Sequence, residues 1–179
     1  GTGKIGQAVI RDLSGFGCKI YAYDVYQSEN VKKYAKYVKT VEEIYQRCDL
    51  ITLHMPLFED NFHLINENAI AQMRDGVVLI NTARGALIDT KALIRGLECG
   101  KVGAAGLDVI EDEFGLYYKD LKAESLSKHD LFILRGFPNV VVTPHMAFYT
   151  DQAVSDMVKH SLLSCCLNER GEENPWEVI

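Results

Sequence analysis

Three residues that are suited to the chemistry of organic acids follow predicted strands in this chain: Arg84, Glu113 and His145. An arginine can hold a carboxylate through two parallel charge-assisted hydrogen bonds. A histidine can exchange a proton with a reacting oxygen near neutral pH, and a neighbouring carboxylate favours its protonated form. Because the carboxyl ends of parallel strands meet at one edge of a sheet, we expect these side chains to converge there. The set suits a substrate that carries both a carboxylate and a carbonyl group.

A second group of residues is typical of a dinucleotide site. Gly1, Gly3 and Gly6 form a G-x-G-x-x-G loop, and the apolar periodicity of residues 5–13 predicts a helix directly after it. Such a loop allows a tight turn, a close approach of the backbone to a pyrophosphate and tight helix packing. Taken alone, the loop could equally be a glycine-rich turn without a ligand. Asp24 ends the next predicted strand, where a carboxylate binds the adenosine ribose and repels the 2′-phosphate of NADP, so we predict that the cofactor is NAD.

Strand-like and helix-like segments alternate along the chain, which predicts an α/β fold: a Rossmann-type doubly wound parallel sheet. The predicted strands are residues 19–23, 50–54, 77–80, 103–109 and 140–143, and the predicted helices are residues 5–13, 31–37, 40–47, 66–73, 89–97 and 149–169. Residues 110–138 interrupt this alternation, and we interpret them as a long functional or interface loop with a short amphipathic piece at 131–134. The last helix is expected to bury a stripe formed by Val154, Met157, Val158, Ser161, Leu162 and Cys165.

The alternation also predicts the domain organisation. We expect residues 1–150 to be the NAD-binding domain, truncated at its N-terminus, and residues 151–179 to be a C-terminal helix and tail. A Rossmann sheet has a strand before its glycine-rich loop. Since the chain opens on that loop, we expect the first strand to be missing and the chain to be a fragment that is catalytically incomplete by itself.

Composition excludes several classes of partner. The formal charge of −6 argues against nucleic acid, which needs a basic face. No apolar run is long enough to span a bilayer, so we expect no membrane partner. The five cysteines are odd in number and form no C-x-x-C pair, so we expect no metal site, no disulfide framework and a cytoplasmic location.

Together these residues resemble the NAD-binding domain of the D-isomer-specific 2-hydroxyacid dehydrogenases, in particular the D-lactate dehydrogenase group. The resemblance rests on Gly1 to Gly6, on Asp24, and on residues 53–57, 79–85, 106–113 and 143–150, and it covers nearly the whole chain. Many family members have proline after the glutamate that corresponds to Glu113. Here Phe114 follows, as in the D-lactate and D-2-hydroxyisocaproate branch.

The resemblance implies a role for each matching residue. Arg84, Glu113 and His145 fall on the catalytic positions, and Arg84 and Phe148 are expected to contact the substrate. The implied cofactor contacts are Gly1, Gly3, Lys4, Ile5, Gly6, Asp24, Met55, Pro56, Asn61, Thr82, Ala83, Arg84 and Asp108. The family also implies a substrate domain that is mostly absent from this chain, toward which residues 151–179 return, and a homodimer for the full-length protein.

The implied activity is an NAD-dependent oxidoreduction between a D-2-hydroxy acid and its 2-keto acid, with D-lactate and pyruvate as the first expectation. Two alternatives stay open: a D-2-hydroxyisocaproate-type dehydrogenase, and a non-enzymatic NAD-sensing protein that resembles a corepressor. A nucleotide-binding methyltransferase would explain the glycine loop and Asp24, but it would leave Arg84, Glu113 and His145 unexplained.

Overall fold

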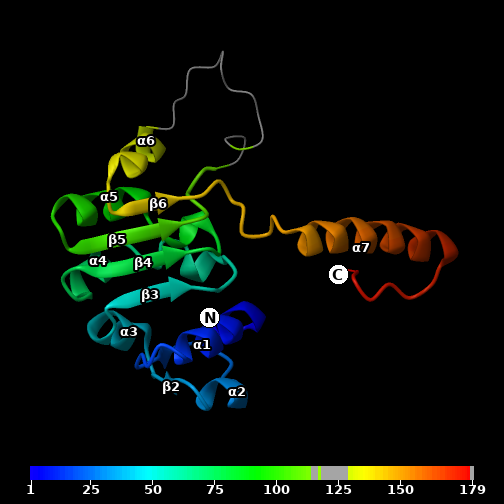
Figure 1. The fold of residues 1–179 in the computed structure, drawn as a ribbon, viewed down its shortest axis with the longest axis horizontal. Helices are drawn as coiled ribbons and strands as arrows, with labels where there is room; N and C mark the ends of the chain where they lie inside the picture. Colours follow the sequence, from blue (N-terminus) through cyan, green and yellow to red (C-terminus); the bar gives the residue numbers. More distant parts are fainter. Residues whose placement is uncertain (114–116, 118–128, 178–179) are drawn as a thin grey trace. The chain divides into compact units, whose positions relative to one another are not determined.

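The computed structural model describes residues 1–113, 117 and 129–177, and these residues form two compact units, Gly1–Pro144 and His145–Ile179. The first unit contains a four-stranded parallel sheet in the order β3-β4-β5-β6 (Figure 1). Its strands are β3 (Leu50–Leu53), β4 (Val77–Asn81), β5 (Val102–Leu107) and β6 (Val140–Val142). A separate two-stranded parallel sheet pairs β1 (Tyr21–Ala22) with β2 (Lys36–Tyr37). The predicted α/β fold with a parallel sheet is confirmed.

Helices connect these strands, as a parallel sheet requires. The helices of the first unit are α1 (Lys4–Ser14), α2 (Glu29–Lys32), α3 (Val41–Arg47), α4 (Glu67–Gln72), α5 (Thr90–Glu98) and α6 (His129–Gly136), with 3-10 turns η1 (Glu59–Asn61) and η2 (Gly85–Leu87). The sequence marks two of the helix starts, because Asn66 and Asp89 accept hydrogen bonds from the backbone N–H groups of Ala69 and Ala92.

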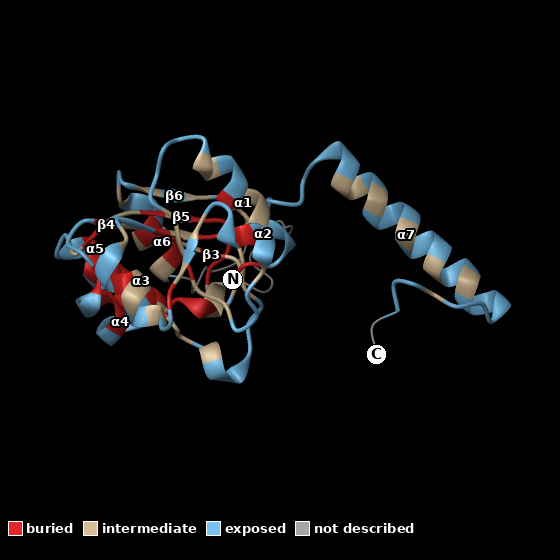
Figure 2. Cartoon of the chain, turned by 90° about the horizontal axis from the view of Figure 1, so that it is seen from below, coloured by how far each residue is buried: buried red, intermediate tan, exposed pale blue. Residues whose placement is uncertain are grey.

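The main hydrophobic core lies between the four-stranded sheet and its helices. Side chains of β4 alternate between buried and half-buried positions, and Val77 and Leu79 are each 1% exposed. Leu93 on α5 and Leu134 on α6 are also buried in this core. Figure 2 shows the buried residues concentrated around α4, α5 and the sheet. This packing gives a firm base to the loops at the carboxyl ends of the strands.

A cavity of about 820 Å³ separates the two sheets; residues of α1, β1, α3 and β3 line it. A doubly wound sheet has the strand order 3-2-1-4-5-6. The observed order is β2-β1, then the cavity, then β3-β4-β5-β6. Gly1 and Gly6 of the glycine loop belong to the lining of this cavity.

One predicted helix is wrong. Residues 31–37 have helical apolar spacing, but α2 ends at Lys32, and Lys36 and Tyr37 form strand β2. The backbone N–H of Lys36 donates to the carbonyl of Ile20, and that of Val38 donates to Ala22, both at 2.9 Å. Pairing with β1 therefore overrides a weak local helical preference.

The predicted long loop at 110–138 is only partly described. Residues 114–116 and 118–128 lie outside the described residues, so the loop interpretation stays a prediction there. The amphipathic piece at 131–134 belongs to helix α6, which buries Leu131 and Leu134.

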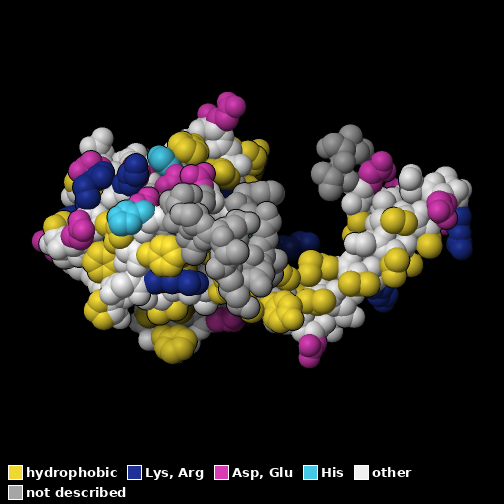
Figure 3. All heavy atoms as spheres, turned by 90° about the horizontal axis from the view of Figure 1, so that it is seen from above, with side chains coloured by type: hydrophobic (Ala, Val, Ile, Leu, Met, Phe, Trp, Pro, Cys, Tyr) yellow, Lys and Arg dark blue, Asp and Glu magenta, His cyan; other side chains and the backbone are white. Residues whose placement is uncertain are grey.

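The second unit contains helix α7 (Asp151–Arg170), which confirms the predicted final helix. Thr150 caps its first turn, and Gly171 ends it with a left-handed φ of 65°. The predicted buried stripe is wrong, because no residue of α7 is buried; Met157, Val158 and Leu162 are 47%, 56% and 63% exposed. Figure 3 shows hydrophobic side chains lying at the surface along this helix. Helical spacing predicted the apolar face of this helix correctly.

The prediction that residues 1–150 and 151–179 are separate parts of the protein stays a prediction. Among the described residues, no helix combines the length and the apolar character that crossing a membrane requires.

Candidate active site

The glycine loop before α1 is shaped by close backbone contacts. A Cβ atom on Gly1 would lie 2.3 Å from the carbonyl oxygen of His54, and one on Gly6 would lie 2.2 Å from that of Gly1. These two glycines are therefore required by packing. A Cβ on Gly3 would have no described atom within 4 Å, and its φ of −67° is open to any residue. Gly3 leaves open space outside the loop, as the approach of a pyrophosphate requires.

The start of α1 suits an anion. Among the described residues, Gly3 provides no side-chain cap and the first turn has no acidic residue. The N–H groups of that turn and the positive end of the helix dipole can therefore face a phosphate. Lys4 and Ile5 lie in this turn and are exposed, consistent with their predicted place beside a cofactor.

Asp24 follows β1 and is held by three donors. Its Oδ2 accepts hydrogen bonds from the backbone N–H of Thr2 at 2.5 Å and from the Thr2 hydroxyl at 3.0 Å, and its Oδ1 accepts from the N–H of Tyr26 at 3.0 Å. Partial burial raises the pKa of Asp24, but the hydrogen bonds from Tyr26 and Thr2 outweigh it and hold the pKa below its ordinary value. The carboxylate is thus kept ionised at the end of β1, directly beside the glycine loop.

Tyr37 completes this network, and the sequence analysis did not identify it. The N–H of Ser28 donates to the Tyr37 hydroxyl oxygen at 3.0 Å, and that oxygen lies 2.8 Å from Thr2 Oγ1. Since the Thr2 hydroxyl donates to Asp24, the Tyr37 hydroxyl must donate to Thr2. Tyr37 therefore orients Thr2 and, through it, the carboxylate of Asp24. The missed signal is that Tyr37 belongs to a strand beside β1 and not to a helix.

The segment after β3 carries three of the predicted cofactor contacts, Met55, Pro56 and Asn61. Met55 packs against the main core, whereas Pro56 is exposed. The side chain of Asn61 closes the loop, because it accepts from the N–H of Phe58 at 2.8 Å and donates to the carbonyl of Pro56 at 2.9 Å. Burial lowers the pKa of the nearby His54, whose ring lies 2.9 Å from the Thr52 hydroxyl. This favours a neutral, structural histidine at position 54.

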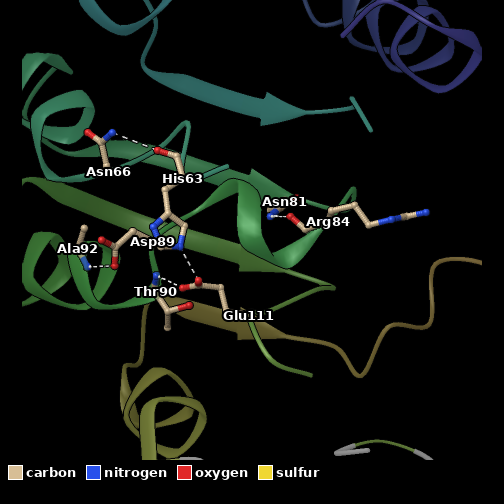
Figure 4. A network of polar contacts seen from close by, with 8 residues as sticks. All are labelled: His63, Asn66, Asn81, Arg84, Asp89, Thr90, Ala92 and Glu111. Carbon is tan, nitrogen blue, oxygen red and sulfur yellow. Dashed lines mark hydrogen bonds and ion pairs between the residues drawn. The ribbon is translucent and has the colours of Figure 1, made fainter. Parts of the chain in front are cut away.

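The loop after β4 presents Arg84. Asn81, which is 1% exposed, accepts from the N–H of Ala83 at 3.0 Å and donates to the carbonyl of Arg84 at 2.9 Å. The side chain of Arg84 is exposed and extends away from Asn81 (Figure 4). Its Nη1 donates to the carbonyl of Ala83 at 2.7 Å. A buried asparagine at the end of an apolar strand thus fixes the turn formed by Thr82, Ala83 and Arg84.

The loop after β5 carries Asp108 and Glu113. Asp108 is 5% exposed; its N–H donates to the carbonyl of Asn81 at 2.9 Å, and its Oδ1 accepts from the Thr143 hydroxyl at 2.5 Å. The carboxylate of Glu113 folds back to accept from the N–H of Ile110 at 3.1 Å. Asp108 therefore links the ends of three neighbouring strands, β4, β5 and β6.

The loops after β4 and β5 are in direct backbone contact. A Cβ on Gly85 would lie 2.0 Å from the carbonyl oxygen of Ile110. Arg84 precedes this glycine, and Glu113 is hydrogen-bonded to the N–H of Ile110. The structure therefore brings the loops of Arg84 and Glu113 together at the carboxyl edge of the sheet.

His145 and Phe148 belong to the second unit. His145 follows Pro144 with a left-handed φ of 51°, which is uncommon outside glycine. Phe148 is 38% exposed and its ring meets that of Tyr149 edge to face at 6.1 Å. Their predicted places beside Glu113 and the substrate stay predictions.

Sequence reasoning also missed two residues of the first unit, His63 and Glu111. Their side chains meet, with His63 Nε2 2.5 Å from Glu111 Oε1. No local pattern marks such a pair, because the two residues are far apart in the sequence. Within the described residues, no group of three or more His, Cys, Asp or Glu side chains is arranged to hold a metal ion, and all five cysteines are unpaired.

Comparison with known proteins identifies the family. Residues 1–147 match the model of the D-isomer specific 2-hydroxyacid dehydrogenase, NAD binding domain. The chain belongs to this family, and its first unit is an NAD-binding domain with the parallel α/β fold described above. The open space beside Gly3, the start of α1 and the ionised Asp24 fit that cofactor.

Similar proteins act on more than one acid. The chain is 49% identical to an aromatic 2-oxoacid reductase of Clostridium sporogenes, over 92% of this chain and 50% of that protein. It is 44% identical to a D-lactate dehydrogenase of Lactiplantibacillus plantarum, over 92% of this chain and 49% of that protein. The chain thus spans about half the length of the curated relatives it matches.

Solved structures give the same picture. A D-lactate dehydrogenase from Treponema pallidum superposes with a TM-score of 0.93 at 41% identity, over all of this chain and 54% of that one. A D-lactate dehydrogenase from Lactobacillus jensenii, determined with NAD+, gives a TM-score of 0.92 at 36% identity over the same shares.

Proposed function

We propose that the full-length protein is an NAD-dependent oxidoreductase that interconverts a D-2-hydroxy acid and its 2-oxo acid. The observation that carries this proposal is the exposed Arg84, presented by a buried asparagine in the same unit as the glycine loop and Asp24. The glycine loop and Asp24 account for a dinucleotide. Arg84 supplies what a dinucleotide alone does not need, a group that binds a substrate carboxylate. Membership of the 2-hydroxyacid dehydrogenase family supports this assignment.

Each proposed catalytic residue has one task. Bound NADH supplies a hydride to the substrate carbonyl. Arg84 holds the substrate carboxylate, using guanidinium N–H groups other than the one that donates to Ala83. His145 donates a proton to the oxygen as it gains charge, and takes it back in the reverse direction. Glu113 accepts a hydrogen bond from the His145 ring and stabilises its protonated form. The product is the 2-hydroxy acid together with oxidised cofactor.

We propose pyruvate and D-lactate as the substrate pair. The D-lactate dehydrogenases among the similar proteins and structures support this choice. The second candidate is an aromatic 2-oxo acid, because the chain is 49% identical to an aromatic 2-oxoacid reductase. Both acids carry the carboxylate that Arg84 would bind, so the substrate side chain separates them.

The test uses the full-length enzyme with NADH and three acids: pyruvate, 4-methyl-2-oxopentanoate and phenylpyruvate. We expect turnover, with the highest kcat/KM on pyruvate; a preference for phenylpyruvate would favour the second candidate. His145→Ala should lower kcat by about 10²-fold or more while NADH still binds. An unchanged kcat in this variant would contradict the role of His145. Tight NADH binding without turnover on any acid would instead favour the NAD-sensing, corepressor-like protein.

The homodimer and the cytoplasmic location stay predictions. Sedimentation of the full-length protein in the presence of NADH would measure its oligomeric state.

A further inference from the structure

A polar network lies beside the predicted catalytic loops. The carboxylate of Glu111 is its centre (Figure 4). Glu111 Oε1 lies 2.5 Å from His63 Nε2, and Oε2 accepts from the N–H of Thr90 at 2.7 Å. Thr90 begins α5, where the helix dipole favours a negative charge. Both oxygens of Glu111 are therefore engaged in charge-assisted hydrogen bonds.

This network joins segments that follow three neighbouring strands. His63 follows β3, Thr90 follows β4 and Glu111 follows β5. The backbone N–H of His63 also donates to the carbonyl of Ala86 at 2.8 Å, so the first two segments are paired by main chain as well. Only 30% of the His63 side chain and 23% of the Glu111 side chain are exposed. Partial burial strengthens the pair compared with an exposed one.

Glu111 stands two positions before Glu113 in a tight turn. Asp112, between them, has a left-handed φ of 51°, and the N–H of Ile110 donates to the Glu113 carboxylate. A fixed Glu111 therefore fixes the turn on which Glu113 stands. The contact between Gly85 and the Ile110 carbonyl extends the same constraint to the loop of Arg84.

We propose that Glu111 and His63 form a positioning pair that sets the placement of Glu113 relative to Arg84. The inference rests on the proposed function. Neither residue of the pair is assigned contact with the substrate or the cofactor. Their role is to hold residues 110–113 against the starts of η2 and α5. Glu113 and Arg84, which follow different strands, then keep a fixed position relative to each other. Small displacements of catalytic groups cost rate far more than they cost binding of a remote cofactor part.

The test compares four single variants of the full-length enzyme with the double variant that combines Glu111→Gln and His63→Leu. Glu111→Gln removes the charge, and His63→Leu removes the ring donor. His63→Gln keeps an N–H that can reach Glu111 Oε1. Glu98→Gln, an exposed carboxylate at the other end of α5, is the matched control. Thermal unfolding and NADH titration are measured for each, besides kcat and KM.

We expect Glu111→Gln and His63→Leu to lower kcat by about 10- to 100-fold, with the Kd for NADH within about twofold of wild type. The double variant should be no slower than the slower single variant, because the two residues act as one unit. His63→Gln should retain most of the turnover, and Glu98→Gln should match wild type. Nitrogen NMR of the His63 ring should show a hydrogen on Nε2, because an ionised carboxylate can only accept.

Three results would overturn the proposal. They are wild-type kcat in folded His63→Leu and Glu111→Gln, a parallel loss of turnover and NADH affinity, and an Nε2 atom without a hydrogen in wild type. A wild-type enzyme that reduces none of the three acids would instead overturn the proposed function, and this proposal with it. Activity of wild type therefore distinguishes the two failures.

Discussion

Asp24 shows how neighbouring residues prepare a single carboxylate for a ligand. Two groups of Thr2 and the N–H of Tyr26 hold its oxygens, and Tyr37 holds Thr2 in turn. An ionised carboxylate accepts about four hydrogen bonds. Capacity for a ribose hydroxyl therefore remains after these internal contacts. The internal contacts also fix where a second negative charge would be repelled.

Replacing Asp24 should change the choice of dinucleotide. In the full-length protein, Asp24→Ala would remove the proposed acceptor for the ribose hydroxyls and the negative charge that would repel a 2′-phosphate. We expect the Kd for NADH to rise about tenfold and the Kd for NADPH to fall. Titration of both dinucleotides measures this, with the exposed Asp12→Ala on α1 as the control. An unaltered ratio of the two affinities would contradict the role of Asp24.

Single residues were predictable where a local pattern carries their chemistry. Asp24 follows a strand at the spacing of a nucleotide site, and the glycine loop has its own signature. Glu111 lies in an acidic run, where a solvated side chain is the usual outcome. Only the fold brings His63 to it, and a contact across such a sequence distance has no local signal.

At the scale of elements, different glycines of the glycine loop serve packing and ligand binding. Gly6 is needed by the backbone of the loop, since a Cβ would meet the Gly1 carbonyl, whereas a Cβ on Gly3 would meet no described atom within 4 Å. Two glycines of one turn therefore differ in role: Gly6 is required for packing, and Gly3 leaves room for a ligand.

Two alanine variants of the full-length protein test this difference. Gly6→Ala should destabilise the fold by about 1–3 kcal/mol or more, because backbone must move. Gly3→Ala should keep the stability within about 1 kcal/mol but weaken NADH binding about tenfold, because the methyl group occupies the pyrophosphate side of the loop. Thermal unfolding and NADH titration measure the two effects. Equal stability losses in both variants would show that packing alone explains the loop.

The elements were predictable where burial and local signals agree. Strand β4 is an apolar run, and α5 has both its periodicity and its Asp89 cap. The helix prediction for residues 31–37 was wrong because their apolar spacing fits a helix, whereas the observed strand β2 depends on hydrogen bonds to β1. Helix α7 was predicted correctly. Burial of its apolar face depends on which surface packs against it, and the spacing of apolar residues contains no information about that surface.

At the scale of the whole molecule, the core of the first unit includes a buried tyrosine. Tyr45 on α3 is 3% exposed, and its hydroxyl donates to the carbonyl of Leu64 at 3.2 Å. Burial, with a smaller effect from the charge of Glu42, raises the pKa of Tyr45 to about 12. The folded state therefore holds this proton more tightly than the unfolded state, in which a tyrosine has a pKa of about 10.

The sign of the pH effect follows from linkage. The stability that Tyr45 contributes is fully present below about pH 10 and is lost as pH rises toward the folded pKa of about 12. As the pH rises from about 10 to about 12, the free energy of unfolding of wild type should fall by on the order of 1–2 kcal/mol relative to that of Tyr45→Phe. Urea unfolding at several alkaline pH values measures it, with the exposed Tyr26→Phe as control. A constant difference between wild type and Tyr45→Phe would contradict the assignment.

The doubly wound architecture was predictable from the alternation of strands and helices, and so was the edge on which the site lies. That edge follows from topology, because parallel strands share a direction. The contacts between loops follow from tertiary packing, which the one-dimensional pattern does not record.

The contact between Gly85 and the Ile110 carbonyl has a consequence for how this protein can diverge. Because Gly85 has a hydrogen where other residues have a side chain, the backbones of the two loops are in direct contact. Neither loop can therefore change its shape independently of the other. An insertion or a larger residue in either loop must be matched by a compensating change in the other. Variation in substrate choice should therefore accumulate in segments outside these two loops, while the two loops are inherited together as one block.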